Sequence, residues 1–278
     1  MKLRLVPILV GLSAVIAVSV AQAEDGQYSV GVDKDHPKNV YWGDTHLHTQ
    51  NSADAYSLMN TMLSPDDAYR FARGQELTAH NGMRVRLRRP LDFLVVSDHA
   101  SFLGGYYRFF KGDPLVVNTD VGRRWASYEN PGQLLGDFAG SINEPEKYTA
   151  LPEKTIKAIW QDVAETSDRN NMPAQFTALT GYEWTSMIDG NNLHRVLIFK
   201  DGADIAGQMR PFSANDSTDP EDLWAALADY EKKTGGEVLS IPHNGNLSNG
   251  LMFSDKTIPG EPLTKSYAQT RARWEPIY

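Results

Sequence analysis

The chain has 278 residues, no cysteine and a formal net charge of −8. Without cysteine there can be no disulfide bond, thiol nucleophile or thiolate metal site, so any metal must be held by nitrogen and oxygen ligands. The acidic balance argues against broad binding to nucleic acids or anionic membranes, and we expect no nucleic-acid partner.

The first predicted element is a secretory signal peptide over residues 1–23. Basic residues precede an apolar run, which ends in the small-x-small pattern AQA before Glu24. The alternative is an uncleaved membrane anchor, which is disfavoured because the run is short and contains Pro7 and Gly11. We therefore expect cleavage after Ala23, a periplasmic or secreted protein with no stable membrane anchor, and one domain over residues 24–278.

Strands and helices alternate along the rest of the chain. Apolar stretches predict strands over residues 41–47, 91–99, 175–184, 194–200 and 237–243. Helices are predicted within 64–74, 151–168 and 219–236. The first and the third have a cap residue, a proline at the first turn and a terminal glycine as start and stop signals. This order predicts an α/β fold with a parallel sheet or barrel, in which sites form at the carboxyl ends of strands.

Residues 76–90 do not fit this alternation. Asn81-Gly82 lies between two short extended runs, which predicts a hairpin. Arg84, Arg86 and Arg88 alternate with apolar residues, so one face of the hairpin is basic. We favour a solubilising, edge-protecting role for these arginines; the alternative is a flap that attracts an anionic substrate.

The segment 104–147 is rich in aromatic residues, glycine and proline and has weak periodicity. We predict a long loop insertion over the top of the sheet. Loops of this length in a compact domain are often lids or binding loops.

Histidines and carboxylates gather at the predicted strand ends. Asp44, His46 and His48 are two residues apart, so they share one face of a strand. Each of the four further predicted strands has a histidine, an acid or both at one end: Asp98 and His99, Glu183, His194 and His243. Asp54 follows shortly after the first strand. His194 is the exception in this pattern, because it opens its strand whereas the others end theirs.

This set has more ligands than one tetrahedral metal ion needs, which predicts two or three metals that share a carboxylate. Close-set metals activate a water as hydroxide and bind the oxygens of a phosphoryl centre. The chain has no G-x-S-x-G element, Walker A loop or dinucleotide-binding fingerprint, so serine hydrolase, NTPase and dehydrogenase functions are not supported.

The segments GDTHLHTQNSAD, DFLVVSDH, GYEW, NLHRVLIF and SIPHNG, taken in order, resemble the motifs of the PHP (polymerase and histidinol phosphatase) superfamily. Within that superfamily, the sequences of these segments are most similar to those of an exported, largely uncharacterised bacterial branch. The resemblance runs from about Val40 to Tyr278. It implies a distorted (β/α)7 barrel, a site with two or three metals and phosphoester hydrolysis.

The resemblance also implies a role for each residue of the set. His46 and His48 would hold the first metal, and Glu183 would bridge it to a second metal completed by His194 and His243. Asp54 and His99 would hold a third metal. Asp98 has no clear ligand role in the family, and we expect it to orient His99 or a water; Asp44 is also expected to act outside the ligand set. Independently of the resemblance, Arg195 and the hairpin arginines are candidates to neutralise a phosphate.

The chain departs from the family pattern at its C-terminal end. The pattern closes with a further Asp-x-His motif, whereas this chain has no histidine after His243. The final letters RWEPIY resemble the start of another strand. The expected fold is therefore an incomplete barrel, truncated at the C-terminus, in which the first and the third metal each lack one ligand and the activity of this chain is in doubt.

Together these patterns predict a metal-dependent hydrolase, most simply a phosphoesterase that uses metal-bound hydroxide on a small anionic substrate. Imidazole and carboxylate ligands suit Zn, Mn and Fe alike. One alternative is hydrolysis of a non-phosphate bond, such as an amide or a lactone, on the same scaffold. Another is a truncated protein that binds metal without catalysis.

Overall fold

The computed structural model describes residues 38–130 and 132–277. The chain divides into two units, Met1–Val40 and Tyr41–Tyr278. Of the first unit only residues 38–40 are described, so the predicted signal peptide lies outside the described residues. Within the described part, no helix has both the length and the apolar character that crossing a membrane requires.

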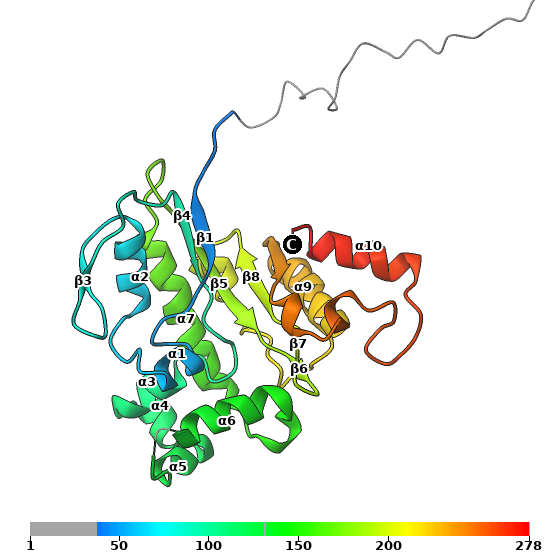
Figure 1. Ribbon diagram of the computed structural model, residues 1–278, viewed down its shortest axis with the longest axis horizontal. Coiled ribbons are helices and arrows are strands. Elements are labelled where there is room, and N and C mark those ends of the chain that lie inside the picture. The colour runs from blue at the N-terminus through cyan, green and yellow to red at the C-terminus, as the bar shows by residue number, and fades with distance from the viewer. Residues whose placement is uncertain (1–37, 131, 278) are drawn as a thin grey trace, which may run out of the picture. The chain divides into compact units, whose positions relative to one another are not determined.

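A curled five-stranded sheet forms the centre of the second unit, in the order β1-β4-β5-β8-β9 (Figure 1). Its strands are β1 (Gly43–Leu47), β4 (Phe93–Val96), β5 (Thr177–Trp184), β8 (Arg195–Phe199) and β9 (Val238–Pro242). Each lies within a predicted strand. The sheet forms about half of a barrel, so the mixed α/β fold agrees with a partial barrel.

The sheet is mixed, which corrects the expectation of a parallel arrangement. β1, β4 and β5 are parallel, whereas β8 runs antiparallel to both β5 and β9. β5 and β8 are joined by a small hairpin, β6 (Met187–Ile188) and β7 (Asn191–Asn192). Its turn residues Asp189 and Gly190 both have positive φ, as Asp-Gly turns between antiparallel strands require.

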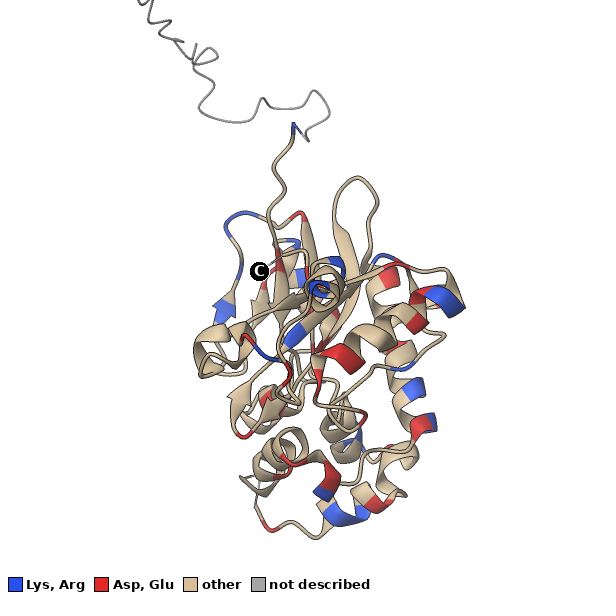
Figure 2. Ribbon diagram, turned by 90° about the vertical axis from the view of Figure 1, so that its right-hand side faces the viewer, with Lys and Arg blue, Asp and Glu red and all other residues tan. Residues whose placement is uncertain are grey.

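Helices cover the convex face of the sheet. On one side α2 (Pro65–Ala72) packs on β4, and α7 (Glu153–Asn170) packs along β5. α8 (Ala203–Ala206) packs against α7, and α10 (Lys265–Trp274) packs against β9 and α9 (Pro220–Thr234). Figure 2 shows basic and acidic residues interspersed along the helices on the side that faces the viewer.

The predicted boundaries of α2 and α9 hold because their local signals are satisfied, whereas α7 continues to Asn170, beyond its predicted range of 151–168. The Ser64 side chain accepts the backbone N–H of Asp67 and forms a full capping box at the start of α2. Asp219 caps α9 in a similar way, and Gly235 ends it in the left-handed region with φ 74°.

Strand alternation separates two faces of the sheet. Tyr182 and Trp184 of β5, with Leu197 and Phe199 of β8, lie on the helix-covered face. There the ring of Trp160 from α7 lies 5.4 Å from Tyr182 and 5.5 Å from Phe199 between centroids. Glu183 alternates with these residues and therefore points to the opposite, concave face.

The prediction that residues 104–147 form a long loop is wrong, because this segment is mainly helical. The segment folds into α3 (Gly105–Phe110), α4 (Pro114–Val117), α5 (Asp120–Ala126), α6 (Gly132–Asn143) and the 3-10 turn η1 (Pro145–Lys147). Each helix is too short to show a clear period in the sequence, but the caps and the core are well formed. Asp113 and Thr119 cap α4 and α5, and buried Trp125 lies 4.6 Å from Tyr106 between ring centroids.

The expected position of the insertion is correct. Helices α3–α6 gather at the end of the sheet where β1 and β4 finish (Figure 1). α6 contacts the short helix α1 (Ala53–Ser57) that follows β1. The ring of Phe138 in α6 lies 5.0 Å from that of His99 between centroids. The insertion therefore covers part of the edge that carries the predicted site.

Two smaller predictions have different outcomes. The hairpin is confirmed as β2 (Leu77–Thr78) and β3 (Arg84–Val85), which pair antiparallel. The expectation that RWEPIY starts a strand is wrong, because Trp274 ends α10 and residues 275–277 have no regular structure. Thr264 caps this helix, and Trp274 is buried at its end.

The remaining elements are the 3-10 turns η2 (Gly245–Leu247) and η3 (Leu251–Phe253).

Candidate metal centre

Glu183 is the centre of the predicted site. It lies within β5, it is fully buried, and its carboxylate is within ion-pair distance of all five histidines of the predicted set. Oε2 lies 2.9 Å from His46 Nε2, 3.0 Å from His48 Nε2 and 3.4 Å from His243 Nε2. Oε1 lies 2.7 Å from His194 Nδ1 and 3.3 Å from His99 Nδ1. One carboxylate thus joins five imidazoles that come from the ends of four strands, β1, β4, β8 and β9.

The mixed topology explains how His194 enters the cluster. β8 runs antiparallel to β5, so its first residues lie beside the last residues of β5. β9 runs antiparallel to β8, and its end returns to the same edge, where the His243 N–H donates to the His194 carbonyl at 3.2 Å. A histidine that opens β8 and one that ends β9 therefore meet at one sheet edge.

β1 supplies two imidazoles from an irregular strand. Its register with β4 shifts between Asp44 and Leu47, as at a β-bulge, a feature that re-aims side chains near many active sites. The Nε2 atoms of His46 and His48 lie 3.0 Å apart. Asp44 accepts the backbone N–H of His46 at 2.9 Å, which steadies this part of the strand.

Asp54 lies beside the cluster on α1. Its carboxylate is 3.4 Å from His48 Nδ1 and 3.4 Å from His99 Nε2, and it accepts the Ser52 hydroxyl at 2.6 Å. Ser52 Oγ also lies 2.8 Å from His48 Nδ1. Asp54 therefore shares its contacts between a histidine of the first predicted metal and one of the third.

Asp98 is buried but contacts neither His99 nor the cluster through its side chain within the described residues. Its carboxylate accepts the backbone N–H of Thr49 at 2.5 Å and the Thr49 hydroxyl at 2.8 Å. Thr49 follows His48 directly. The Asp98 carboxylate therefore holds the chain at the end of β1 and does not contact His99, which we expected it to orient. Burial raises the pKa of Asp98 to about 6, although the Thr49 hydrogen bonds and the charge of His48 act in the opposite direction.

The structure does not bring Arg195 into the cluster. Residues 194 and 195 are neighbours in an extended strand, so their side chains point to opposite faces. The Arg195 guanidinium is buried, donates from Nε to Glu275 Oε1 at 2.9 Å and lies over the ring of Trp184. Burial lowers the pKa of Arg195, while Glu275 counteracts the shift.

The protonation of the cluster follows from its single buried anion. Burial would raise the pKa of Glu183, but the charge of His99 and the nearby imidazoles of His194, His243 and His46 hold this pKa well below the usual range. Burial would lower the pKa of His48, but Asp54 and Glu183 raise it to about 10. Burial lowers the pKa of His194 despite Glu183, so its imidazole is neutral, the form that ligates metals.

The donor set fits a divalent metal. Two groups, His46-Glu183-His243 and His48-His99-Glu183, offer ligand atoms within 4.8 Å of one another and share Glu183. His194 Nε2 and His243 Nδ1 are buried without a hydrogen-bond partner among the described residues, and the buried His243 Nε2 has only its 3.4 Å approach to Glu183 Oε2. Unpartnered buried polar atoms are rare in folded proteins, and a metal ion would satisfy such nitrogens. Buried histidine and glutamate side chains here could therefore hold a metal ion.

Three contacts of the cluster were not predicted from the sequence. Thr185 Oγ1 lies 2.5 Å from His99 Nδ1, Ser52 contacts His48 and Asp54, and Thr49 connects β1 to Asp98. In the sequence, the only indication of these contacts is a serine or threonine one or two positions from a candidate ligand. Serine and threonine are too common for this spacing to be distinctive.

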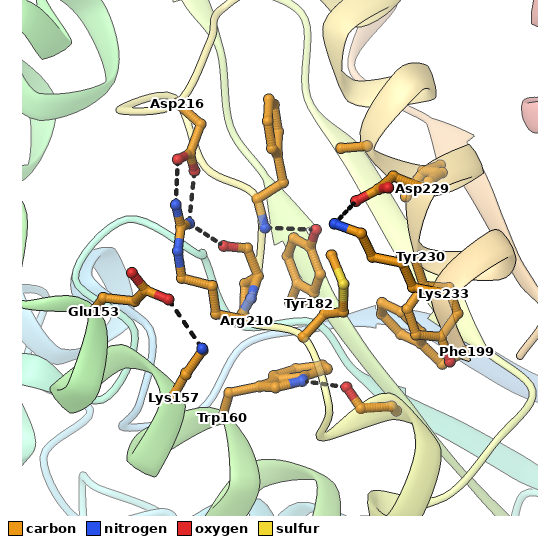
Figure 3. Close-up of a pocket in the computed structure, with 16 residues that line it drawn as sticks. Glu153, Lys157, Trp160, Tyr182, Phe199, Arg210, Asp216, Asp229, Tyr230 and Lys233 are labelled. Carbon is orange, nitrogen blue, oxygen red and sulfur yellow. Dashed lines mark hydrogen bonds and ion pairs between the residues drawn. The ribbon is translucent and has the colours of Figure 1, made fainter. Parts of the chain in front are cut away.

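A larger cavity lies away from this cluster. Its volume is about 430 Å³, and it opens between α7, α9 and the helix-covered face of the sheet, with Trp160, Tyr182 and Phe199 in its wall (Figure 3). Its charged residues pair with one another, as Arg210 does with Asp216 and Lys157 with Glu153. None of the predicted site residues lines it, so cavity size does not mark the chemical site in this protein.

Comparison with known families gives one match. A family model described as "Protein of unknown function (DUF3604)" matches residues 35–278. No curated protein and no solved structure matches the chain.

Proposed function

Since the chain belongs to the DUF3604 family, whose function is unknown, we propose from the site itself that it is a metal-dependent hydrolase that acts on phosphoesters. One observation carries the proposal: a fully buried glutamate contacts five histidines at a single sheet edge. Burying so many imidazoles around one carboxylate is costly unless they serve a bound cation.

Glu183 and the five histidines would hold two or three Zn, Mn or Fe ions, with Asp54 as a further ligand. When bound, these ions supply an activated water and positive charge for a phosphoryl oxygen. The two oxygens of Glu183 face different imidazoles, which suits a carboxylate shared between ions.

The surrounding residues position these donors. Asp98 holds Thr49 and so fixes His48, and Ser52 orients His48 together with Asp54. Phe138 from the helical insertion packs against His99 and limits the access of water there. His46 is the most exposed histidine of the cluster, with 37% of its side chain accessible, so a substrate approaches from its side.

The proposal includes kinship with the PHP superfamily and export from the cytoplasm. The order of the motifs, the partial barrel and the convergence of the carried-over ligands support the kinship. The N-terminal sequence pattern supports export, with a periplasmic or secreted location.

The test is a substrate panel at neutral pH with the purified protein loaded in turn with Zn, Mn or Fe. We expect turnover of phosphoesters, loss of turnover on chelation and recovery on return of the metal, because the activated water depends on the ion. Turnover of amides or lactones alone would show that the bond is not a phosphoester. A metal-loaded, folded protein that turns over no substrate would instead favour a non-catalytic metal-binding protein.

A further inference from the structure

A second, smaller cavity lies directly beside the candidate metal centre. Its volume is about 160 Å³, and His48 and Thr49 form part of its wall. The rest of the wall is mainly apolar and comes from β1, α2, the loop before α2 and the hairpin: Leu47, Leu63, Ala68, Phe71, Leu77 and Val85. We call this cavity the His48 pocket. Because His48 belongs to both the wall of the pocket and the cluster, the pocket adjoins the candidate metal centre at this residue.

The size of the pocket limits its occupant. A dry apolar cavity of about 150 Å³ in another protein accommodates one benzene molecule. The His48 pocket has nearly the same volume and a similar lining. It therefore fits one aromatic ring or one branched alkyl group.

The walls of the pocket are tied together by the backbone. The Gln50 N–H donates to the Leu63 carbonyl at 2.9 Å, which fixes the loop before α2 against the end of β1. In the hairpin the Ala79 N–H donates to the Met83 carbonyl at 2.7 Å. The pocket is therefore built into the fold and does not depend on side-chain packing alone.

The hairpin has two chemically different faces. Leu77 and Val85 line the pocket, whereas Arg84, Arg86 and Arg88 are exposed. Arg84 pairs with Glu76, the acidic residue that precedes the hairpin. No acidic residue occurs from residue 77 to residue 91, so the exposed face of the hairpin carries a net positive charge while the face toward the pocket is apolar.

We propose that the His48 pocket binds the apolar group of the substrate, so that the natural substrates are phosphoesters of an aromatic or branched-alkyl alcohol. This inference rests on the proposed function. The phosphoryl group lies at the cluster near His46 and His48, the ester oxygen at the edge of the pocket, and the apolar group among Phe71, Leu77 and Val85.

The test compares benzyl phosphate with glycerol phosphate, two esters with similar alkoxide leaving groups. In Val85→Phe the added ring fills the pocket, and we expect the ratio of kcat/KM for benzyl phosphate to that for glycerol phosphate to fall about tenfold or more. Thr78→Phe is the matched control, because Thr78 lies on the neighbouring hairpin strand, is exposed and does not line the pocket. In this control the ratio stays at the wild-type value.

Binding of benzylphosphonate, which cannot be hydrolysed, provides a readout that does not need turnover. Calorimetry should show about tenfold weaker binding to Val85→Phe than to wild type or Thr78→Phe. If no phosphoester is hydrolysed but this pattern of binding is found, the proposed function fails and the pocket assignment stands. An unchanged kcat/KM ratio together with unchanged benzylphosphonate binding in a folded Val85→Phe variant would overturn the inference.

Leu77→Ala serves as a second variant if Val85→Phe does not fold. It enlarges the pocket, so (naphthylmethyl) phosphate should gain in kcat/KM relative to benzyl phosphate. No relative gain for the larger ester would also contradict the inference.

Discussion

Glu183→Gln is expected to lower the phosphoesterase activity more than about 100-fold, beyond the effect of removing an outer-sphere partner of a metal ligand. Glutamine keeps the shape of the side chain but removes the one buried anion that contacts all five histidines. The variant should also lose the rise in melting temperature that metal ions give the wild-type protein, because that stabilisation depends on metal affinity.

Glu237→Gln is the control for this prediction. Glu237 is exposed and pairs only with Lys200 among the described residues, so activity and metal response should match the wild type. Wild-type activity and a full metal response in Glu183→Gln would show that Glu183 is not the shared ligand.

Glu275→Ala is expected to lower the free energy of unfolding by about 3–5 kcal/mol, the usual cost of leaving a buried charge without its partner. Glu275 is buried, and its carboxylate accepts from Arg195 Nε at 2.9 Å, Trp224 Nε1 at 2.9 Å and Arg271 Nε at 3.0 Å. The substitution leaves the Arg195 guanidinium buried against the Trp184 ring with no anion. Chemical denaturation of the metal-free protein measures the loss.

Two comparisons sharpen this second prediction. Asp229→Ala removes an exposed pair with Lys233 and should cost less than about 1 kcal/mol. Arg195→Met/Glu275→Leu replaces both charges by apolar groups and should be more stable than Glu275→Ala alone. If Glu275→Ala instead keeps its stability and loses activity, Arg195 acts on the substrate after all.

The predictable parts of the fold were those with complete local signals. Each of the five strands lies in an apolar stretch, and α2 and α9 have a cap residue, a proline in the first turn and a stop glycine. α7 follows a proline but has no stop glycine. The helical insertion lacks such signals because its helices are short and are stabilised by tertiary contacts, such as the buried Trp125 that donates to Asp137 at 2.8 Å. Its aromatic residues indicated burial but not the secondary structure.

The candidate site was predictable because scarce residues occur at strand ends. His194 was the difficult member, and its signal was Asp189-Gly190, a hairpin turn that predicts an antiparallel neighbour for β5. Arg195 was assigned by adjacency to His194, although alternation in a strand places adjacent residues on opposite faces. Its partner Glu275 is 80 residues away, and no local pattern could reveal that pair.

The central claim is that the cluster around Glu183 holds metal ions. The most direct test is elemental analysis of metal content per chain in the purified protein, beside a His46→Ala/His48→Ala variant. We predict two or more Zn, Mn or Fe ions per wild-type chain and the loss of at least one in the variant. A folded wild-type protein that holds no metal after incubation with each of these ions would contradict the claim.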